Sequence, residues 1–467
     1  MKINKNNLYI IIIIISILIK FIGITNPGLE VSHNWRQALS NMAALNYFEF
    51  GYDISEPGDR FSGQRPGIAP MEFPLLPSLI WGISKLFNCF SDWYGRIIIL
   101  LFSVAGIYAA FLSIRHYFDK ETAFIACIAL SYSIWLPFSR KVMPDILSFS
   151  LMLTSINFIR KYIIGKNFLN LFLCMLTFSL ALLTKISSII YLSCFIIIIA
   201  GTDFAKLKKL YLFSLLILCI TPALYWYFVH VPELALKNPS GHFFMGKSMI
   251  EGIRELKQFP GELLQRLFVT PMHYIGGFIF VVSLVKWRKH THEISLFIAS
   301  FLILIPVLLK TGMHFVHHDY YVLPLVPFIA LGAGSLLRSL KEGMVKWMLI
   351  IGIVIEGIVH FYPDLMIHGE MRKLEGLADK LDSLDIQSPV VINGGLNPCA
   401  MFYTGRYGWS LSNEEIKDMN NQKILIKGRC NAIVILRKTF EKEMESPGKL
   451  IYSDDDFLIS ELSDEQE

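Results

Sequence analysis

The chain has 467 residues, of which 54% are hydrophobic and only 17% are charged. Because soluble domains carry about 25% charged residues, this composition excludes an ordinary soluble domain and favours a membrane protein. The formal net charge of +5 does not indicate nucleic-acid binding, since the basic residues are scattered among short loops.

Apolar runs fill the first three quarters of the chain, and many approach the roughly 20 residues that a helix needs to cross a bilayer. The first run has no small-residue cleavage site after it, so we expect a retained span rather than a signal peptide. The stretch 74–88 is short and interrupted by proline, and it is predicted to be a helix at the membrane interface. The runs predict about eleven spans, at 8–25, 92–114, 121–138, 145–160, 168–184, 186–201, 209–228, 267–285, 293–309, 320–337 and 345–361.

Residues 168–201 would form a single helix of about 51 Å, which is too long for one crossing. Basic segments flank this stretch on both sides, so it should cross the membrane an even number of times. It is therefore predicted to form two short spans, with Thr184 and Lys185 in the outer hairpin between them.

Basic residues set the orientation of the spans. Under this assignment six short segments share one side of the membrane, and each holds two or three Lys or Arg with few acids: "MKINKNN", "RHYFDK", "RKYIIGK", "AKLKKL", "KWRKH" and "RSLKEGMVK". The positive-inside rule places that side, and the N-terminus, in the cytoplasm. Loops 26–91 and 229–266 and everything after residue 362 then lie outside, in the periplasm of a cell with an inner membrane.

The chain changes character after residue 362, where charges become frequent and apolar runs shorten. "EMRKLEGLADKLDSL" (370–384) predicts an amphipathic helix, "PVVIN" and "NAIVILR" predict buried strands, and "KLIYSDDDFLISEL" predicts a hairpin. "SNEE" (412–415) has the form of a helix N-cap, and "SDEQE" at the end is expected to be a frayed tail. The predicted fold is a polytopic α-helical membrane protein, with residues 1–362 as the membrane domain and 363–467 as a small extracytoplasmic α/β domain.

Two features of this last region stay open. The aromatic stretch "MFYTGRYGW" (401–409) fits a surface that selects a substrate, or equally a buried patch that packs within the domain or on the first outer loop. Cys399 and Cys430 would form a disulfide only if they meet in space.

Ionisable and aromatic residues gather at the outer ends of the predicted spans. Each has a plain structural explanation by itself: an acid caps a helix, a lysine reaches the headgroups and a tyrosine joins the aromatic belt. Their concentration at one face indicates a functional site instead. The candidates are Glu30, His33, Trp35, Arg36 and Gln37 after the first span, Glu72, then Arg140, Lys141 and Asp145, then Lys185, and finally His317, His318, Asp319, Tyr320 and Tyr321.

These residue types suit one kind of chemistry. Arginine and lysine bind phosphate oxygens, and a carboxylate or imidazole can deprotonate an attacking hydroxyl. Nucleotide sugars and ATP are cytosolic, so an enzyme acting at the outer face needs an activated group that arrives on a lipid. The sequence therefore predicts a lipid-phosphate donor.

Five segments carry a resemblance to a known family: "HNWRQALSNMAALNYFEFG", "EFPLLPSLIWGISKLF", "SRKVMPDILSFSLM", "LLTKIS" and "HDYYVLPLVP". In this order and spacing, over residues 8 to about 340, the chain resembles the C-type membrane glycosyltransferases. The nearest branch holds bacterial lipid A aminoarabinose transferases and protein O-mannosyltransferases. The resemblance implies that a hexose or pentose is moved from a polyprenyl-phosphate donor to an envelope lipid, glycan or protein at the outer face of the inner membrane.

The resemblance also implies roles for the candidates. The first outer loop should supply the general base, but where relatives often carry Asp or Asp-Glu this chain has His33-Asn34-Trp35-Arg36, with Glu30 three residues earlier. The base is therefore open between His33 and Glu30. Asp145 matches the family's acid at the start of the fourth span. The donor phosphate and substrate are expected to contact Arg36, Gln37, Arg140, Lys185, His318, Asp319, Tyr320 and Tyr321.

Glu72 matches a glutamate that takes part in metal binding in some relatives. The resemblance therefore leaves open a divalent metal ion at Glu72 with a histidine. No histidine has a diagnostic spacing from it. The nitrogen candidates are His242, His273, His317 and His318.

The alternative function is a transporter or flippase for a lipid-linked sugar. It predicts charged residues inside the spans and broken helices at mid-membrane. Lys20 and Glu356 are the main charged residues within predicted spans, and both lie towards span ends or could reach the headgroups. The gathering of charges at one face favours an enzyme.

Overall fold

The computed structural model describes residues 5–63, 67–237, 247–286, 291–418, 430–438 and 444–462. The chain divides into two compact units. The helical unit comprises Met1–Ile24, Arg96–Val231 and Phe243–Pro363, and the sheet unit comprises Thr25–Gly95, Pro232–His242 and Asp364–Glu467.

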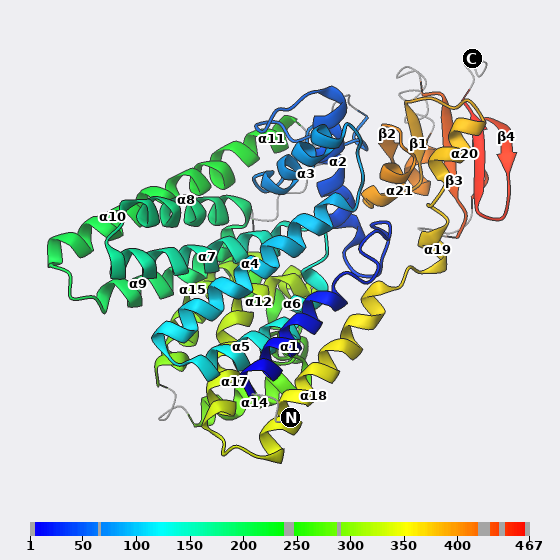
Figure 1. The fold of residues 1–467 in the computed structure, drawn as a ribbon. Helices are drawn as coiled ribbons and strands as arrows, with labels where there is room; N and C mark the ends of the chain where they lie inside the picture. The colour runs from blue at the N-terminus through cyan, green and yellow to red at the C-terminus, as the bar shows by residue number, and fades with distance from the viewer. Residues whose placement is uncertain are drawn as a thin grey trace. The chain divides into compact units, whose positions relative to one another are not determined.

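The helical unit is a bundle of long and short helices (Figure 1). Helices α5 and α7 form its centre, because α5 packs against α17 and α7 packs against α8. Gly334 of α17 allows this contact, since a Cβ there would lie 2.8 Å from the backbone nitrogen of Ala126 on α5. The α-helices are α1 Lys5–Ile19, α4 Tyr94–Tyr117, α5 Lys120–Ser131, α6 Trp135–Phe138, α7 Pro144–Gly165, α8 Phe168–Thr184, α9 Leu192–Ala200, α10 Lys206–Tyr225, α12 Met249–Leu256, α13 Pro260–Phe268, α14 His273–Val285, α15 Thr291–Thr311, α16 Met313–His317, α17 Val326–Ser339 and α18 Met344–Phe361. Helix α11 Val231–Lys237 belongs to the sheet unit except for its first residue.

Five of the described helical segments are long and apolar enough to cross a membrane, and α13 and α14, bent by 85°, would make a sixth as a pair. The prediction of a helical multi-span membrane protein is therefore confirmed. Several other predicted spans are helical but short, among them α1 with 15 residues and α8 with 17. The count of eleven crossings stays a prediction.

As predicted, residues 168–201 are not one continuous helix. Helix α8 ends at Thr184, and Lys185 takes an extended conformation with φ −154° and ψ 111°. A 3-10 helix, Ile186–Tyr191, then leads into α9. The break exposes backbone groups and side chains at the end of α8 that a continuous helix would not present.

The sheet unit contains a five-stranded mixed sheet in the order β2-β1-β3-β5-β4. Strand β1 runs parallel to β2 and β3, while β5 is antiparallel to β3 and β4. The predicted strands "PVVIN" and "NAIVILR" and the predicted hairpin are confirmed as β1, β3 and the β4–β5 pair. The strands are β1 Val390–Ile392, β2 Gly408–Ser410, β3 Ala432–Leu436, β4 Lys449–Ser453 and β5 Phe457–Glu461.

The helices of this region differ in part from the prediction. The expected helix at 370–384 is two short ones, α19 Gly369–Arg372 and α20 Leu377–Ser383, because Gly376 has a φ of +78° and interrupts it. Ser412 caps α22 Asn413–Lys417 through a capping box, as "SNEE" predicted. Helix α21 Pro398–Tyr403 and strand β2 occupy the aromatic stretch. The tail "SDEQE" lies outside the described residues.

The first outer loop belongs to the sheet unit and extends its sheet. The loop carries α2 Asn34–Phe50 and α3 Leu75–Phe87, the latter at the predicted interfacial helix. The Gly63 amide donates to the Gly408 carbonyl at 2.7 Å, and the Ser410 amide donates to the Phe61 carbonyl at 3.2 Å. The loop therefore covers the free edge of β2, which would otherwise be open to pairing with another chain.

One apolar core joins the loop to the rest of the sheet unit. Ala38 and Met42 of α2 pack in it with Met401 and Phe402 of α21. The stretch "MFYTGRYGW" thus contributes to this core, which favours the packing explanation over an exposed binding surface. Packing of this kind explains why a loop and a domain that are far apart in sequence form one unit.

Cys399 and Cys430 do not meet. Cys399 packs in the cluster that contains Val390 and Ile392, whereas Cys430 packs in the cluster that contains Val391. Successive residues of a strand face opposite sides of a sheet, so the two thiols lie on opposite faces. Both are free, and burial raises the pKa of each thiol, that of Cys430 to about 12.

Candidate functional site

The helical unit holds a buried ion pair between Asp145 and Lys185. Asp145 lies in the first turn of α7, where Pro144 is favourable at the start of the helix and an acid favours the helix dipole. Lys185 projects from the break after α8, and its ammonium is 3.4 Å from Asp145 Oδ1. The same ammonium lies 5.0 Å from the centre of the Tyr320 ring. Three predicted site residues from separate segments are thus brought together.

The Asp145 carboxylate is incompletely satisfied. Its side chain is 1% exposed, and neither oxygen accepts a hydrogen bond from the described residues. A buried carboxylate without hydrogen bonds is costly, so its stabilisation must come from Lys185 and from the dipole of α7. The pair can still accept from a hydroxyl and can offer its ammonium to an anion, which suits the binding of a phosphorylated sugar.

Aromatic rings surround this pair on one side. Tyr320 lies in the 3-10 helix Asp319–Leu325, which leads into α17. Its ring stacks on His318 at 5.3 Å between centroids and lies 4.6 Å from Tyr321. Asp319 begins the same helix and is half-buried. The predicted group "HDYY" is therefore in place beside Lys185.

Arg140 is buried in the helical unit and shares a hydrogen-bond acceptor with Arg96. Its guanidinium donates to the Gly23 carbonyl, and Arg96 donates to the same carbonyl at 3.0 Å. Arg140 also lies over Phe361, with 5.9 Å from the guanidinium carbon to the ring centre. Lys141 is equally buried, with its ammonium 5.1 Å from the Phe138 ring.

Two buried basic residues of the helical unit, Arg96 and Lys20, were not among the predicted site residues. Arg96 is 1% exposed near the start of α4, and an arginine within the apolar run "YGRIIILL" was the signal that could have identified it. Lys20 is fully buried, and its ammonium has no hydrogen-bond partner among the described residues. Lys20 directly follows the end of α1, as expected of a residue near a span end, but its side chain is buried and does not reach a surface.

The sheet unit holds the predicted residues of the first outer loop. His33 precedes α2 with φ 62° and ψ 25°, and Ser32 before it has φ 67°. Two successive residues other than glycine in the left-handed region are unusual and store strain, which is often found at functional sites. The His33 carbonyl accepts from the Arg36 and Gln37 amides at 3.1 Å, which fixes the start of the helix.

Arg36 and Glu72 form an ion pair within the same unit. The Arg36 guanidinium also lies 5.6 Å from the Trp35 ring. Glu30 is 1% exposed, and one of its carboxylate oxygens accepts from the Asn26 side chain at 2.9 Å. Gln37 is fully buried in α2.

The described residues do not form a metal site. No group of three or more His, Cys, Asp or Glu among them could hold a metal ion, and the Glu72 carboxylate pairs with Arg36. The His273 ring stacks face to face on His360 at 4.2 Å. His242, which we considered as a ligand, lies outside the described residues.

Comparison with known proteins identifies the fold. Residues 68–226 match the family model of dolichyl-phosphate-mannose-protein mannosyltransferases. No curated protein matches the chain significantly in sequence. Among solved structures, ArnT from Cupriavidus metallidurans bound to undecaprenyl phosphate is similar with a TM-score of 0.59 at 10% identity, and the match covers 99% of each chain.

Two further enzymes have the same fold. The oligosaccharyltransferase AglB from Archaeoglobus fulgidus matches with a TM-score of 0.51 at 12% identity, over 93% of this chain and 70% of that one. The mycobacterial arabinofuranosyltransferase AftD matches with a TM-score of 0.55 at 10% identity, over 99% of this chain and 42% of that one. The resemblance seen in the sequence is therefore confirmed: the chain has the fold of the C-type membrane glycosyltransferases, and residues 68–226 match their mannosyltransferase family.

Proposed function

We propose that the protein is a membrane glycosyltransferase that moves a sugar from a polyprenyl-phosphate donor to a hydroxyl of an envelope lipid, glycan or protein. The observation that carries the proposal is the buried Asp145–Lys185 pair beside Tyr320 in a chain with this fold. A buried carboxylate that accepts no hydrogen bond from the described residues can accept from sugar hydroxyls, while the lysine attracts phosphate.

The donor class is supported by the relatives and by the cations of this chain. The ArnT structure contains undecaprenyl phosphate, and an AglB structure contains dolichol-phosphate. In this chain Lys185, Arg140 and Arg36 are the predicted phosphate ligands, and arginine and lysine are the side chains best suited to phosphate oxygens. His318, Asp319, Tyr320, Tyr321 and Gln37 would line the sugar or the carrier lipid.

The reaction is an inverting displacement. The acceptor oxygen attacks the anomeric carbon of the sugar as the bond between that carbon and the phosphate oxygen breaks. Polyprenyl phosphate leaves with the electron pair, and the acceptor proton passes to a protein base. Because a phosphate ester leaves readily, one base without a separate acid can suffice.

His33 and Glu30 remain the two candidates for the base. The strained backbone at Ser32 and His33 supports His33, because strain of this kind persists where the position of a side chain matters. An imidazole has an unperturbed pKa of about 6.5, which suits proton transfer near neutral pH. Glu30 is buried and hydrogen-bonded to Asn26, which supports a role in positioning as well as in proton transfer.

The proposed topology follows the basic segments. Eleven crossings would place the N-terminus in the cytoplasm of a cell with an inner membrane, and the sheet unit in the periplasm. The positive-inside rule supports this orientation. The acceptor would then meet the enzyme at the outer face, where the donor is presented on its lipid.

The test is transfer by purified protein in detergent, with a panel of radiolabelled polyprenyl-phosphate sugars and extracted envelope acceptors. His33→Asn is the sharpest variant, because asparagine also tolerates the left-handed backbone but cannot act as a base. We expect His33→Asn to lose about 10²-fold or more in rate while the protein stays folded.

Glu30→Gln is the matched comparison, and the variant with the larger loss identifies the base. Tight donor binding without turnover for any sugar would contradict the proposal and favour a transporter of lipid-linked sugars. Full activity in both His33→Asn and Glu30→Gln would exclude the first outer loop as the source of the base.

A further inference from the structure

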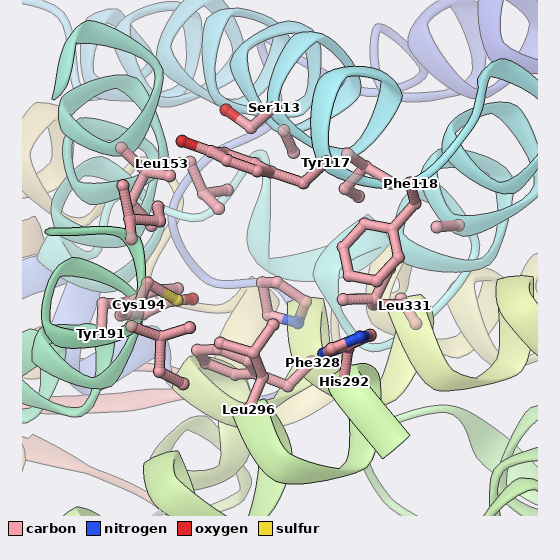
Figure 2. Close-up of a pocket in the computed structure, with 18 of the residues that line it drawn as sticks. Ser113, Tyr117, Phe118, Leu153, Tyr191, Cys194, His292, Leu296, Phe328 and Leu331 are labelled. Atoms are coloured by element: carbon pink, nitrogen blue, oxygen red, sulfur yellow. The ribbon is translucent and has the colours of Figure 1, made fainter. Parts of the chain in front are cut away.

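A large apolar cavity lies inside the helical unit. Its volume is about 520 Å³, within the range of about 300–1,000 Å³ that is typical of ligand pockets. Its walls come from α4, α5, α7, α9, α15 and α17, and most lining side chains are aliphatic or aromatic (Figure 2). Phe118, Leu153, Leu296, Phe328 and Leu331 are examples.

This cavity is separate from the Asp145–Lys185 pair. Helix α7 begins at Pro144, and the residues of α7 that line the cavity are Leu153 and Ile156. At 1.5 Å per residue they lie about 12 and 17 Å along the helix from Asp145. Most of the cavity therefore lies towards the end of α7 at Gly165, while Tyr191 in its wall reaches Phe149, one turn from Asp145.

Two buried hydroxyl groups in the cavity wall lack partners. Ser113 is 7% exposed and Tyr191 is 1% exposed, and neither hydroxyl makes a hydrogen bond to any described residue. Buried hydroxyls are nearly always hydrogen-bonded, and leaving one unpaired costs about 1–3 kcal/mol. Both are donors that can serve an acceptor-only group of a ligand, such as an ester carbonyl.

The polar atoms of the cavity are not spread evenly. Figure 2 shows Ser113 beside Tyr117 on one wall and Tyr191 beside Cys194 on another, whereas Phe118 and Leu331 lie opposite, with the His292 imidazole next to Leu331. The Tyr191 ring is held between Phe149 and Phe328, at 6.4 and 5.0 Å between centroids. A ligand here must combine a long apolar part with few hydrogen-bond acceptors.

Two arginines and a histidine border the same end of the bundle. Arg115 and His116 end α4, and Arg160 lies near the end of α7, a neighbour of α4 because a Cβ at Gly106 would lie 2.6 Å from the Ser150 hydroxyl. Arg160 is held by two hydrogen bonds to the Asn157 side chain, at 2.8 and 3.2 Å. Basic pockets between membrane helices on the cytoplasmic side bind anionic lipid headgroups.

We propose that this cavity binds one acyl chain of an anionic diacyl phospholipid from the inner leaflet. The chain fills the apolar space, an ester carbonyl accepts from a buried hydroxyl, and the phosphate lies among Arg115, His116 and Arg160. Membrane lipids are the apolar molecules that surround such a protein. The charge of Arg115 and Arg160 favours an anionic headgroup over a zwitterionic one.

The test is photo-crosslinking in the intact protein. The protein is placed in phosphatidylcholine vesicles with a small fraction of phosphatidylglycerol that carries a diazirine on one acyl chain, close to its ester group. After illumination, labelled peptides are mapped by mass spectrometry. We expect label in 110–118 and 194–201, displaced by added phosphatidylglycerol and much less by phosphatidylcholine.

Three variants test where the lipid binds. Leu153→Trp fills the cavity and should reduce the label about tenfold, whereas Leu101→Trp, at a residue of α4 that is 64% exposed, should not. The double variant Ser113→Ala with Tyr191→Phe keeps the shape of the cavity and should weaken labelling by about 3–10-fold through the loss of the hydrogen bond to the ester carbonyl.

Three results would overturn the proposal. The first is label only at exposed positions of the helices. The second is equal displacement by both phospholipids. The third is displacement by polyprenyl phosphate at lower concentration than by phosphatidylglycerol, which would assign the cavity to the carrier lipid instead. If Leu153→Trp fails to fold, the double variant Ser113→Ala with Tyr191→Phe tests the proposal in its place.

Discussion

The Lys185 ammonium lies 3.4 Å from Asp145 Oδ1, and the two side chains are 10% and 1% exposed. The lysine comes from a break between two helices and the aspartate from the first turn of a third. Burying two charges costs several kcal/mol unless each compensates the other. A pair of this kind is weak evidence for stability alone, and its place beside Tyr320 supports a role in binding substrate.

Removing one partner of this pair should destabilise the protein. Lys185→Met leaves Asp145 buried without its cation, and we expect a loss of about 3–5 kcal/mol in the free energy of unfolding. The double variant Lys185→Met with Asp145→Leu should recover most of that loss, because no uncompensated charge remains. Thermal unfolding in detergent measures both. Transfer activity should be absent from the single and the double variant, so an active double variant would contradict the proposed role.

The hydrogen bond between Tyr403 and Asp92 should hold the first outer loop to the sheet region. The Tyr403 hydroxyl donates to Asp92 Oδ2 at 3.0 Å, and the Gly28 amide donates to the same oxygen at 3.2 Å. Burial, and then the Asp92 charge, raise the pKa of Tyr403 well above its usual value, so the hydroxyl stays a donor at neutral and mildly alkaline pH.

Tyr403→Phe should therefore cost about 1.5–3 kcal/mol, as expected for a bond to a charged group. Faster hydrogen exchange in residues 28–42 of the full chain would report the loss. Tyr452→Phe is the control, because its hydroxyl bonds to Asp454 and lies within the β4–β5 hairpin. Unchanged exchange in residues 28–42 of Tyr403→Phe would show that the apolar core alone holds the loop.

The β4–β5 turn should lose stability in acid. Burial alone would raise the pKa of Asp454, but hydrogen bonds from Tyr452, Phe457 and Asp456, with the charge of Lys380, lower it overall. A carboxylate with a lowered folded pKa contributes stability above its unfolded pKa of about 3.9 and loses it as the pH falls through the folded value.

Hydrogen exchange of residues 449–461 in the full chain, between about pH 3 and pH 7, measures this effect. Exchange in the wild-type hairpin, corrected for the intrinsic rate, should speed up below about pH 4. In Asp454→Asn the amides of the hairpin should exchange faster than in the wild type near neutral pH. Their corrected exchange rate should not rise further as the pH falls through that range. A wild-type hairpin that keeps full protection at the acid end would contradict the assignment.

A charge network should tie α18 to α5 and α1. The Lys346 ammonium is 2.5 Å from Glu121, and Lys5 is 2.5 Å from both Glu121 and Glu342. The Lys346 side chain is 1% exposed and that of Glu121 is 28% exposed. Lys346→Met leaves Glu121 with Lys5, so we expect a loss of about 1–3 kcal/mol, less than for a fully buried pair.

Thermal unfolding compares this variant with Lys341→Met, which removes a charge from an exposed residue near the same helix. The control should unfold at the wild-type temperature. Equal unfolding temperatures for Lys346→Met and Lys341→Met would show that the network adds nothing beyond packing.

Periodicity and composition predicted those elements whose signal is local. The apolar runs, the basic loops and the strands "PVVIN" and "NAIVILR" are each recognisable from a few neighbouring residues. The break at Lys185 followed from helix length together with the basic segments on both sides. The predicted helix at 370–384 failed because Gly376 takes a left-handed conformation that an amphipathic pattern does not reveal.

Long-range packing could not be predicted. Nothing in "MFYTGRYGW" shows that Met401 and Phe402 share a core with Ala38 and Met42, more than 350 residues earlier. The pairing of Asp145 with Lys185 was likewise invisible, because residue type gives the chemistry but not the partner. Arg96 was missed because a single arginine at the start of an apolar run resembles a residue that reaches the headgroups.

The measurement that tests the central claim most directly is the release of polyprenyl phosphate by purified protein. Each sugar transferred to an acceptor must free one molecule of the carrier, so the two products should appear in equal amounts. We expect this equality for the wild type with at least one donor, and loss of both products in Asp145→Asn. Sugar that moves with its carrier lipid still attached, or carrier released without transfer, would contradict the account.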